Sequence, residues 1–143
     1  MPSFTTTVSN LRASGPQVEI FVAPSFDLQK YLKENNQNIP EPIRVIGLID
    51  TGSTSSLVKP ETIRTLGINP IGEKRINTPS CTDFKCNQYQ ATIMFPNRIA
   101  IQISSLLEAP LTGQNIQCLI GRDILSQAVF IYNGYANLIT FSM

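Results

Sequence analysis

Apolar and polar residues alternate along most of the chain, which is the pattern of β-strands that bury one face. The alternation is clearest over residues 18–22, 43–49, 99–103 and 129–132. Asn133-Gly134 follows the last of these stretches and precedes another apolar run, and Asn-Gly is typical of a two-residue hairpin turn. The pattern therefore predicts that 129–132 and 135–141 pair as antiparallel strands.

Helical signals are few and short. Ser25 is a good N-cap for a helix over 26–34, because its hydroxyl can accept a hydrogen bond from the first turn. A proline at the first position and Gly67 just beyond the last favour a second helix over 60–66. A third short helix is expected over about 122–127. The sequence thus predicts an all-β fold with two or three short helices.

The length of 143 residues suits one hydrophobic core, and we expect a single domain over residues 1–143. The formal net charge of +1 provides no electrostatic footprint for nucleic acid or for an anionic membrane. The apolar runs are far too short to span a membrane, and the N-terminus lacks the pattern of a secretory signal. These observations predict a cytoplasmic protein without a nucleic-acid or membrane partner.

The chain contains no histidine, and this absence excludes the largest number of mechanisms. Ser-His-Asp triads, Cys-His pairs and HExxH zinc sites all require an imidazole. Cys81, Cys86 and Cys118 form no CxxC pair and indicate neither a zinc site nor a disulfide framework, and Cys118 is expected to pack as a small apolar residue. We therefore expect no metal and no organic cofactor, and carboxylates are the expected catalytic groups of any enzyme activity.

The segment 48–54, Leu-Ile-Asp-Thr-Gly-Ser-Thr, carries the candidate chemistry. An apolar strand ends here at Asp50, and Gly52 permits a tight turn beside it. A carboxylate at such a turn can accept hydrogen bonds from backbone amides and from the hydroxyls of Thr51 and Ser53, which would fix its orientation. Asp-Thr-Gly is also an ordinary strand-ending turn, so the motif needs context elsewhere in the chain.

Two further segments supply that context. Residues 74–95 have the pattern of a flap hairpin, and residues 118–125 read Cys-Leu-Ile-Gly-Arg-Asp-Ile-Leu. With the segment 48–58, and in this order, they resemble the retropepsin-like aspartic peptidases, in particular the small bacterial ones. The resemblance implies the retropepsin-like acid protease fold, with a peptidase core over 43–143 and an N-terminal strand and helix extension over 1–42. In that family the third segment runs beneath the catalytic loop and leads into a short helix.

The resemblance assigns roles residue by residue. Asp50 takes the catalytic position, Thr51 cross-links the two active-site loops, Gly52 contacts the substrate backbone, and Ser53 completes the loop. Other positions are implied to line the side-chain pockets or to lie near the flap tip: Leu48, Leu57, Ile76, Thr78, Pro79, Ser80 and Leu119. The family usually has glycines at the flap tip, and this chain departs from that pattern.

Arg122 lacks the acidic partner that its position has in viral members of the family. In viral members the matching arginine pairs with an acidic residue shortly after Asp-Thr-Gly, but residues 53–56 carry no charge here. Arg122 must therefore find another partner, either a carbonyl or Asp123.

Cys81 and Cys86 fall on the same side of the expected flap turn, which disfavours a disulfide between them.

Aspartic peptidase chemistry needs two carboxylates about 3 Å apart that share one proton. Because the chain has one Asp-Thr-Gly, it can build the pair only as a symmetric homodimer with Asp50 from each subunit. One carboxylate acts as a base on water while the other, protonated, polarises the scissile carbonyl of a polypeptide substrate. The hypothesis is a homodimeric aspartic endopeptidase. The alternative is a catalytically silent dimerisation or peptide-binding module on the same fold.

Three finer expectations follow. A Ser53 hydroxyl that donates to ionised Asp50 would lower the pKa of that carboxyl and give cleavage an acidic optimum. A strand within 138–142 would be a free edge that joins the dimer interface. Pro79 and Ser80 would form the tip of a mobile hairpin that closes over substrate.

Overall fold

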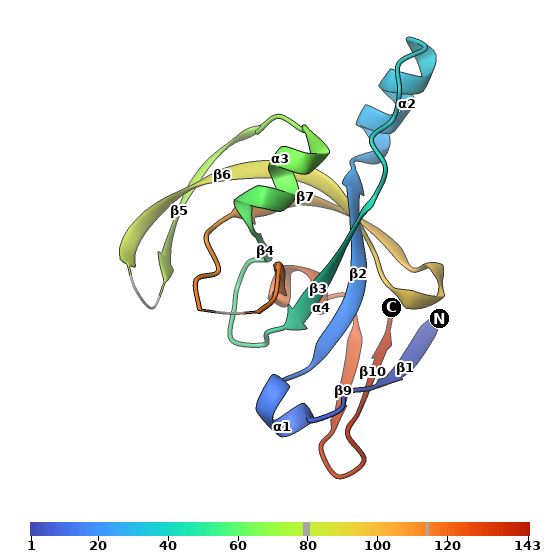
Figure 1. Cartoon of the computed structure of the whole chain (residues 1–143), viewed down its shortest axis with the longest axis vertical. Coiled ribbons are helices and arrows are strands. Elements are labelled where there is room, and N and C mark those ends of the chain that lie inside the picture. Colours follow the sequence, from blue (N-terminus) through green and yellow to red (C-terminus); the bar gives the residue numbers. More distant parts are fainter. Residues whose placement is uncertain (79–80, 114) are drawn as a thin grey trace.

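The computed structural model describes residues 1–78, 81–113 and 115–143, and it is mostly β-sheet with short helices (Figure 1). Within these residues the strands form one sheet of seven strands and a second of three. The architecture therefore agrees with the all-β fold that the alternating pattern predicted.

The larger sheet is nearly a closed barrel. Its strands, in spatial order, are β2 (Gln17–Pro24), β3 (Ile43–Ile49), β8 (Cys118–Ile120), β4 (Leu57–Val58), β7 (Ala100–Glu108), β6 (Cys81–Met94) and β5 (Gly72–Thr78). Because β2 also pairs with β6, six of these strands close into a ring, and β5 lies outside it along β6. The alternation along β2 puts Val18, Ile20 and Val22 inside, each 3% exposed or less.

The smaller sheet contains β1 (Ser3–Thr7), β10 (Leu138–Ser142) and β9 (Val129–Asn133), with β10 in the middle. The predicted antiparallel pairing of the last two strands is confirmed, but the predicted two-residue turn is wrong. Asn133 pairs with Leu138, so the connection spans residues 134–137. The side chain of Asn133 accepts a hydrogen bond from the N–H of Ala136 at 3.1 Å. Asn137, rather than the glycine, adopts the left-handed conformation with φ of 54°.

Four short α-helices and one 3₁₀ turn occur in the described residues. They are α1 (Leu11–Ser14), α2 (Phe26–Glu34), α3 (Pro60–Leu66), α4 (Arg122–Leu125) and η1 (Pro96–Arg98). The three predicted helices are confirmed. The sequence did not predict α1, which is a fourth helix. Ser25 caps α2 by accepting from the N–H of Leu28 at 3.2 Å, and Gly67 ends α3 with φ of 69°. None of these helices has the length and apolar character to cross a membrane.

The main hydrophobic core joins the barrel to the three-stranded sheet. The rings of Phe4, Phe95 and Phe141 stack between them, with centroids 4.7 to 6.4 Å apart. A second, smaller apolar cluster contains Leu57 and Leu119 and lies on the side of the barrel where Asp50 follows β3. The second cluster is the part of the interior that reaches the candidate site.

The expectation that the C-terminal strand is a free edge is wrong. β10 has β1 on one side and β9 on the other, and Ile139 and Phe141 are fully buried. The free edges of this sheet are β1 and β9 instead. Val129 and Ile131 on β9 are 52% and 53% exposed, so the accessible apolar surface lies on the neighbouring strand.

Replacing Phe141 with alanine should therefore cost stability rather than merely weaken an interface. The loss of a fully buried aromatic ring is expected to lower the free energy of unfolding by about 3–5 kcal/mol. Urea unfolding followed by circular dichroism measures this loss. Tyr135→Ala, at a fully exposed position on the same hairpin, is the control and should leave the midpoint unchanged. A loss below about 1 kcal/mol for Phe141→Ala would contradict the assignment of β10 to the core.

Candidate active site

Asp50 lies where β3 ends, at the first residue of the loop that connects β3 to β4. Its N–H donates to the carbonyl of Ile120 at 2.9 Å, which ties it to the end of β8. The N–H of Gly52 donates to the Asp50 carboxylate oxygen Oδ1 at 2.9 Å. The turn therefore fixes the direction of the carboxylate through a backbone amide, as the sequence predicted.

Ser53 does not contact that carboxylate through its hydroxyl. The hydroxyl donates to the carbonyl oxygen of Ser55 at 2.6 Å, and the Ser53 N–H donates to the backbone carbonyl of Asp50 at 3.2 Å. The expected hydroxyl bond to Asp50 is therefore wrong, because the curvature of the loop brings a nearer acceptor to Ser53. The side chain stabilises the loop rather than the charge of Asp50.

The loop lies directly on the backbone of Gly121, which follows β8. A Cβ atom at this position would be 2.6 Å from the carbonyl oxygen of Ser55 and 3.0 Å from that of Ser53. Real Cβ atoms essentially never approach another atom to 2.6 Å, so only glycine fits. The segment 118–125 thus runs beneath the loop, as the resemblance implied.

Arg122 holds the first half of the loop. Its N–H donates to the carbonyl of Ser53 at 2.8 Å, and its guanidinium Nη1 donates to the carbonyl of Thr51 at 2.7 Å. Of the two partners considered for Arg122, the structure selects a backbone carbonyl. The missing acidic residue after Asp-Thr-Gly is thereby replaced by an acceptor within the turn itself.

Asp123 and Ser56 hold the second half of the loop, and sequence reasoning did not predict their contact. Ser56 is fully buried, and its N–H and hydroxyl donate to the two carboxylate oxygens of Asp123 at 2.9 and 2.7 Å. The Ser56 hydroxyl oxygen also accepts from the N–H of Gly121 at 3.0 Å. Because these residues are 67 positions apart in the chain, no local pattern signals their contact.

A cavity of about 570 Å³ opens beside Asp50. Its walls come from the loop, the β5–β6 hairpin, the second apolar cluster and the segment after β7. The lining residues are Asp50, Gly52, Ser53, Thr54, Ser55, Leu57, Ile76, Asn77, Thr78, Cys81, Phe84, Ala109, Pro110, Leu111, Thr112 and Leu119. Asp50 is the single carboxylate among them.

Most of the residues singled out from sequence lie together in this cavity, and two lie elsewhere. Asp50, Gly52, Ser53, Leu57, Ile76, Thr78 and Leu119 are all lining residues. Thr51 is exposed on the turn, and Leu48 packs against Gly15 and the second apolar cluster without lining the cavity of the single chain. Pro79 and Ser80 lie outside the described residues.

Phe84 and Leu111 were missed as lining residues. Phe84 lies directly opposite Ile76 in the register of the hairpin, and both are partly buried against the second apolar cluster. The register between β5 and β6 was therefore the signal that could have found it. Leu111 lies in an irregular segment after β7, where no periodic pattern marks a buried position.

Burial makes two of the three cysteine thiols, Cys86 and Cys118, poor nucleophiles. Burial raises the pKa of Cys118 to about 12, with the charge of Asp123 adding to the effect. Burial likewise raises the pKa of the Cys86 thiol, and the nearby Glu108 carboxylate raises it further. All cysteines are free, and Cys81 and Cys86 lie on the same strand, as expected. Among the described residues, no group of three acidic, cysteine or histidine side chains could hold a metal.

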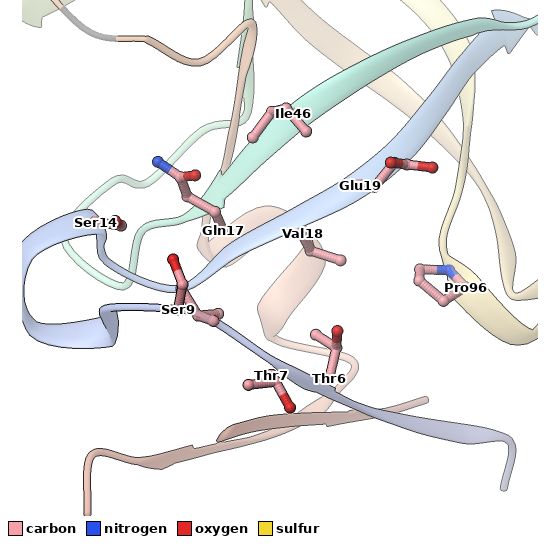
Figure 2. A pocket seen from close by; sticks show the side chains of 10 residues that line it. Thr6, Thr7, Ser9, Ser14, Gln17, Val18, Glu19, Ile46 and Pro96 are labelled. Atoms are coloured by element: carbon pink, nitrogen blue, oxygen red, sulfur yellow. The ribbon is translucent and has the colours of Figure 1, made fainter. Parts of the chain in front are cut away.

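A second cavity of about 290 Å³ lies between β1 and β2 (Figure 2). Thr6 and Thr7 line it from β1, and Gln17 and Glu19 line it from β2. Glu19 is the one ionisable side chain among its described lining residues, and it forms an ion pair with Arg44 at 2.6 Å. The one carboxylate of this cavity pairs with an arginine, whereas Asp50 is oriented by a backbone amide, so the Asp50 cavity is the better candidate site.

The fold is that of the retropepsin-like aspartic proteases. A retropepsin-like aspartic protease from Rickettsia conorii matches 98% of this chain and 91% of its own, with a TM-score of 0.57 and 14% sequence identity. The retroviral protease-like domain of Ddi1 from Leishmania major matches 86% of each chain, with a TM-score of 0.48 and 12% identity. No protein-family model and no curated protein sequence matches the chain. At 14% identity, the likeness to the Rickettsia protease shows the fold alone.

Gly121→Ala tests the contact beneath the loop. The added Cβ would collide with the Ser55 carbonyl, so we expect a loss of about 1–3 kcal/mol or more in the free energy of unfolding. The amide resonances of residues 50–56 should shift in the same variant. Gly72→Ala is the matched control, because a Cβ there meets the Gln88 side chain at an ordinary 3.4 Å. Equal stability of the two variants would contradict the close approach.

Proposed function

We propose that this protein is an aspartic endopeptidase that acts as a homodimer on polypeptide substrates. Asp50 of each subunit would supply one carboxylate of a pair that shares a proton, because two ionised carboxylates at that distance repel each other. The ionised member removes a proton from a water molecule, and the protonated member donates a hydrogen bond to the scissile carbonyl. No metal or organic cofactor enters this mechanism.

The observation that carries the proposal is the setting of Asp50. Its carboxylate is oriented by the Gly52 amide and is the one carboxylate lining an otherwise uncharged cavity, whose walls combine apolar side chains with hydroxyl groups. Such a cavity suits the apolar side chains of an extended peptide next to the cleaved bond. Leu57, Ile76 and Leu119 are proposed to contact those side chains, and Gly52 to contact the peptide backbone.

The homodimer follows from the single carboxylate. Thr51 and Gly52 are exposed at the turn, which leaves the loop accessible to the same loop of a second copy. The proposed role of Thr51 is to cross-link the two loops. The exposed apolar side chains of Val129 and Ile131, on the free edge strand β9, offer further surface for the second copy to cover.

The N-terminal residues belong to the same folded unit as the candidate site. We propose one domain over residues 1–143, because segments from 1–42 contribute β1 and β2 to the two sheets. A cytoplasmic location and a hairpin whose tip, at residues 79–80, closes over substrate remain predictions from sequence.

Asp50→Asn should abolish cleavage of an unfolded protein substrate. Loss of an essential catalytic group typically lowers the rate by at least about 1000-fold, because the base that activates water is gone. Digestion across the acidic and neutral pH range, followed by mass spectrometry of the peptides, measures the loss. Asp27→Asn, on the projecting helix α2, is the matched control and should cleave like the wild type. Equal digestion by wild type and Asp50→Asn, or none by either, would favour the silent module instead.

Mixing the two proteins tests whether the site is shared. When a fixed amount of wild type exchanges subunits with a threefold excess of Asp50→Asn, random pairing leaves about a quarter of the wild-type activity. If each chain carried a complete site, the activity would stay unchanged. The same dilution of the wild type with buffer in place of Asp50→Asn is the control.

The pH profile gives a further test. Two coupled carboxyls should produce a bell-shaped dependence of kcat/KM on pH, with two apparent pKa values that belong to the pair. Because the Ser53 hydroxyl donates to Ser55 and not to Asp50, Ser53→Ala should leave both limbs of the bell in place. A shift of the acidic limb toward neutral pH would mean that the hydroxyl contacts Asp50 in the active dimer.

A further inference from the structure

The hairpin that forms one wall of the Asp50 cavity has an irregular register. Ile76 pairs with Phe84, and the next pair is Thr78 with Cys81. Between these pairs β5 contributes one residue and β6 contributes two, residues 82–83. This arrangement is a β-bulge, which commonly turns a strand next to a functional site.

The bulge decides which side chains face the cavity. Side chains alternate along a regular strand, so two residues three positions apart point to opposite faces. Cys81 and Phe84 are three apart on β6, yet both line the Asp50 cavity. The extra residue in β6 therefore brings the end of the hairpin onto the same face as Ile76 and Phe84.

Asp83 is the residue at which the backbone departs from the regular strand. Its φ of 60° lies in the left-handed region, which a residue with a side chain adopts at an energetic cost. Two contacts from the opposite strand hold it there. Its N–H donates to the Asn77 side-chain oxygen Oδ1 at 3.0 Å, and its carboxylate pairs with Arg75 at 3.0 Å.

We propose that Asp83 is a positioning residue for the substrate, a role that rests on the proposed peptidase function. Asp83 does not itself line the cavity; it acts by holding the bulge that turns the hairpin residues beyond it toward the peptide. A regular β5–β6 ladder would direct Cys81 away from the peptide and would narrow the apolar wall to Ile76 and Phe84.

Two substitutions separate the backbone conformation from the side chain. Glycine adopts a positive φ without penalty, whereas alanine does not. Asp83→Ala should raise KM for a peptide substrate about tenfold with kcat changed less than about twofold, and Asp83→Gly should stay within about threefold of the wild type in both. This rescue by glycine, with the effect concentrated in KM, is not the behaviour of a generally destabilised protein.

A matched control lies on the same hairpin. Glu73 pairs with Lys85 at 3.0 Å, and the exposed fractions of this pair, 55% and 56%, are close to the 63% and 62% of Asp83 and Arg75. Glu73→Gln removes an equivalent surface ion pair away from the bulge and should leave KM unchanged. An equal rise in KM for Glu73→Gln and Asp83→Ala would overturn the proposal.

Cys81 provides a readout that needs no cleavage. It is the exposed cysteine of the chain, whereas Cys86 and Cys118 are buried. An apolar peptide with a reduced, non-cleavable central bond should slow alkylation of Cys81 by iodoacetamide in the wild type and in Asp83→Gly, but not in Asp83→Ala. A strong HN–Hα Overhauser effect within residue 83 should report the positive φ in the wild type, and it should weaken in Asp83→Ala.

The two hypotheses fail in different ways. Equal cleavage by wild type and Asp50→Asn overturns the peptidase, while protection of Cys81 by the peptide still measures how the hairpin faces its ligand. The role of Asp83 is overturned by a wild-type KM in Asp83→Ala, by equal losses in the alanine and glycine variants, or by peptide protection that does not depend on residue 83.

Discussion

The contact between the Asp50 loop and the backbone of Gly121 is the constraint on which the candidate site depends. The loop leaves β3 and enters β4, and both strands are neighbours of β8 in the sheet, so it must pass over the end of β8. Two backbones meet there without room for a side chain. Arg122 and Asp123, directly after the glycine, then fasten the two halves of the loop from below.

The two sides of the cavity are built very differently. Leu57 and Leu119 form the floor next to Asp50, and they belong to the packed interior with exposures of 8% and 7%. The hairpin wall is mostly exposed and is braced by surface ion pairs, which contribute little stability individually. A firm floor keeps the carboxylate in place, whereas a lightly held wall can be changed by substitution with little cost to the fold.

Local signals explain which features could be predicted from the sequence. The cap at Ser25 and the terminating Gly67 act within one turn of their helices, so the pattern alone places α2 and α3 correctly. The turn after β9 was mispredicted because contacts from the other end of the chain decide its shape. Asn137 accepts hydrogen bonds from the N–H groups of Val8 and Leu11.

The same distinction applies to the site. Asp50 and its Gly52 contact are two residues apart and were predictable, whereas Ser56 with Asp123, and the bulge that directs Phe84 and Cys81, depend on pairing between distant segments. The prediction that the Ser53 hydroxyl donates to Asp50 was wrong for a related reason. The Asp50 carboxylate and the Ser55 carbonyl are both near Ser53 in sequence, and the path of the loop over Gly121 brings the Ser55 carbonyl to the hydroxyl.

The central place of β10 in the three-stranded sheet bears on the order in which the fold forms. β10 comprises residues 138–142, and both β1 and β9 take their hydrogen bonds from it. Ser3 pairs with Ser142 and Thr7 with Leu138, so β1 gains its partner only when two segments far apart in sequence meet. Such long-range pairing slows folding, so we expect β1 to join the sheet after the local β9–β10 hairpin has formed.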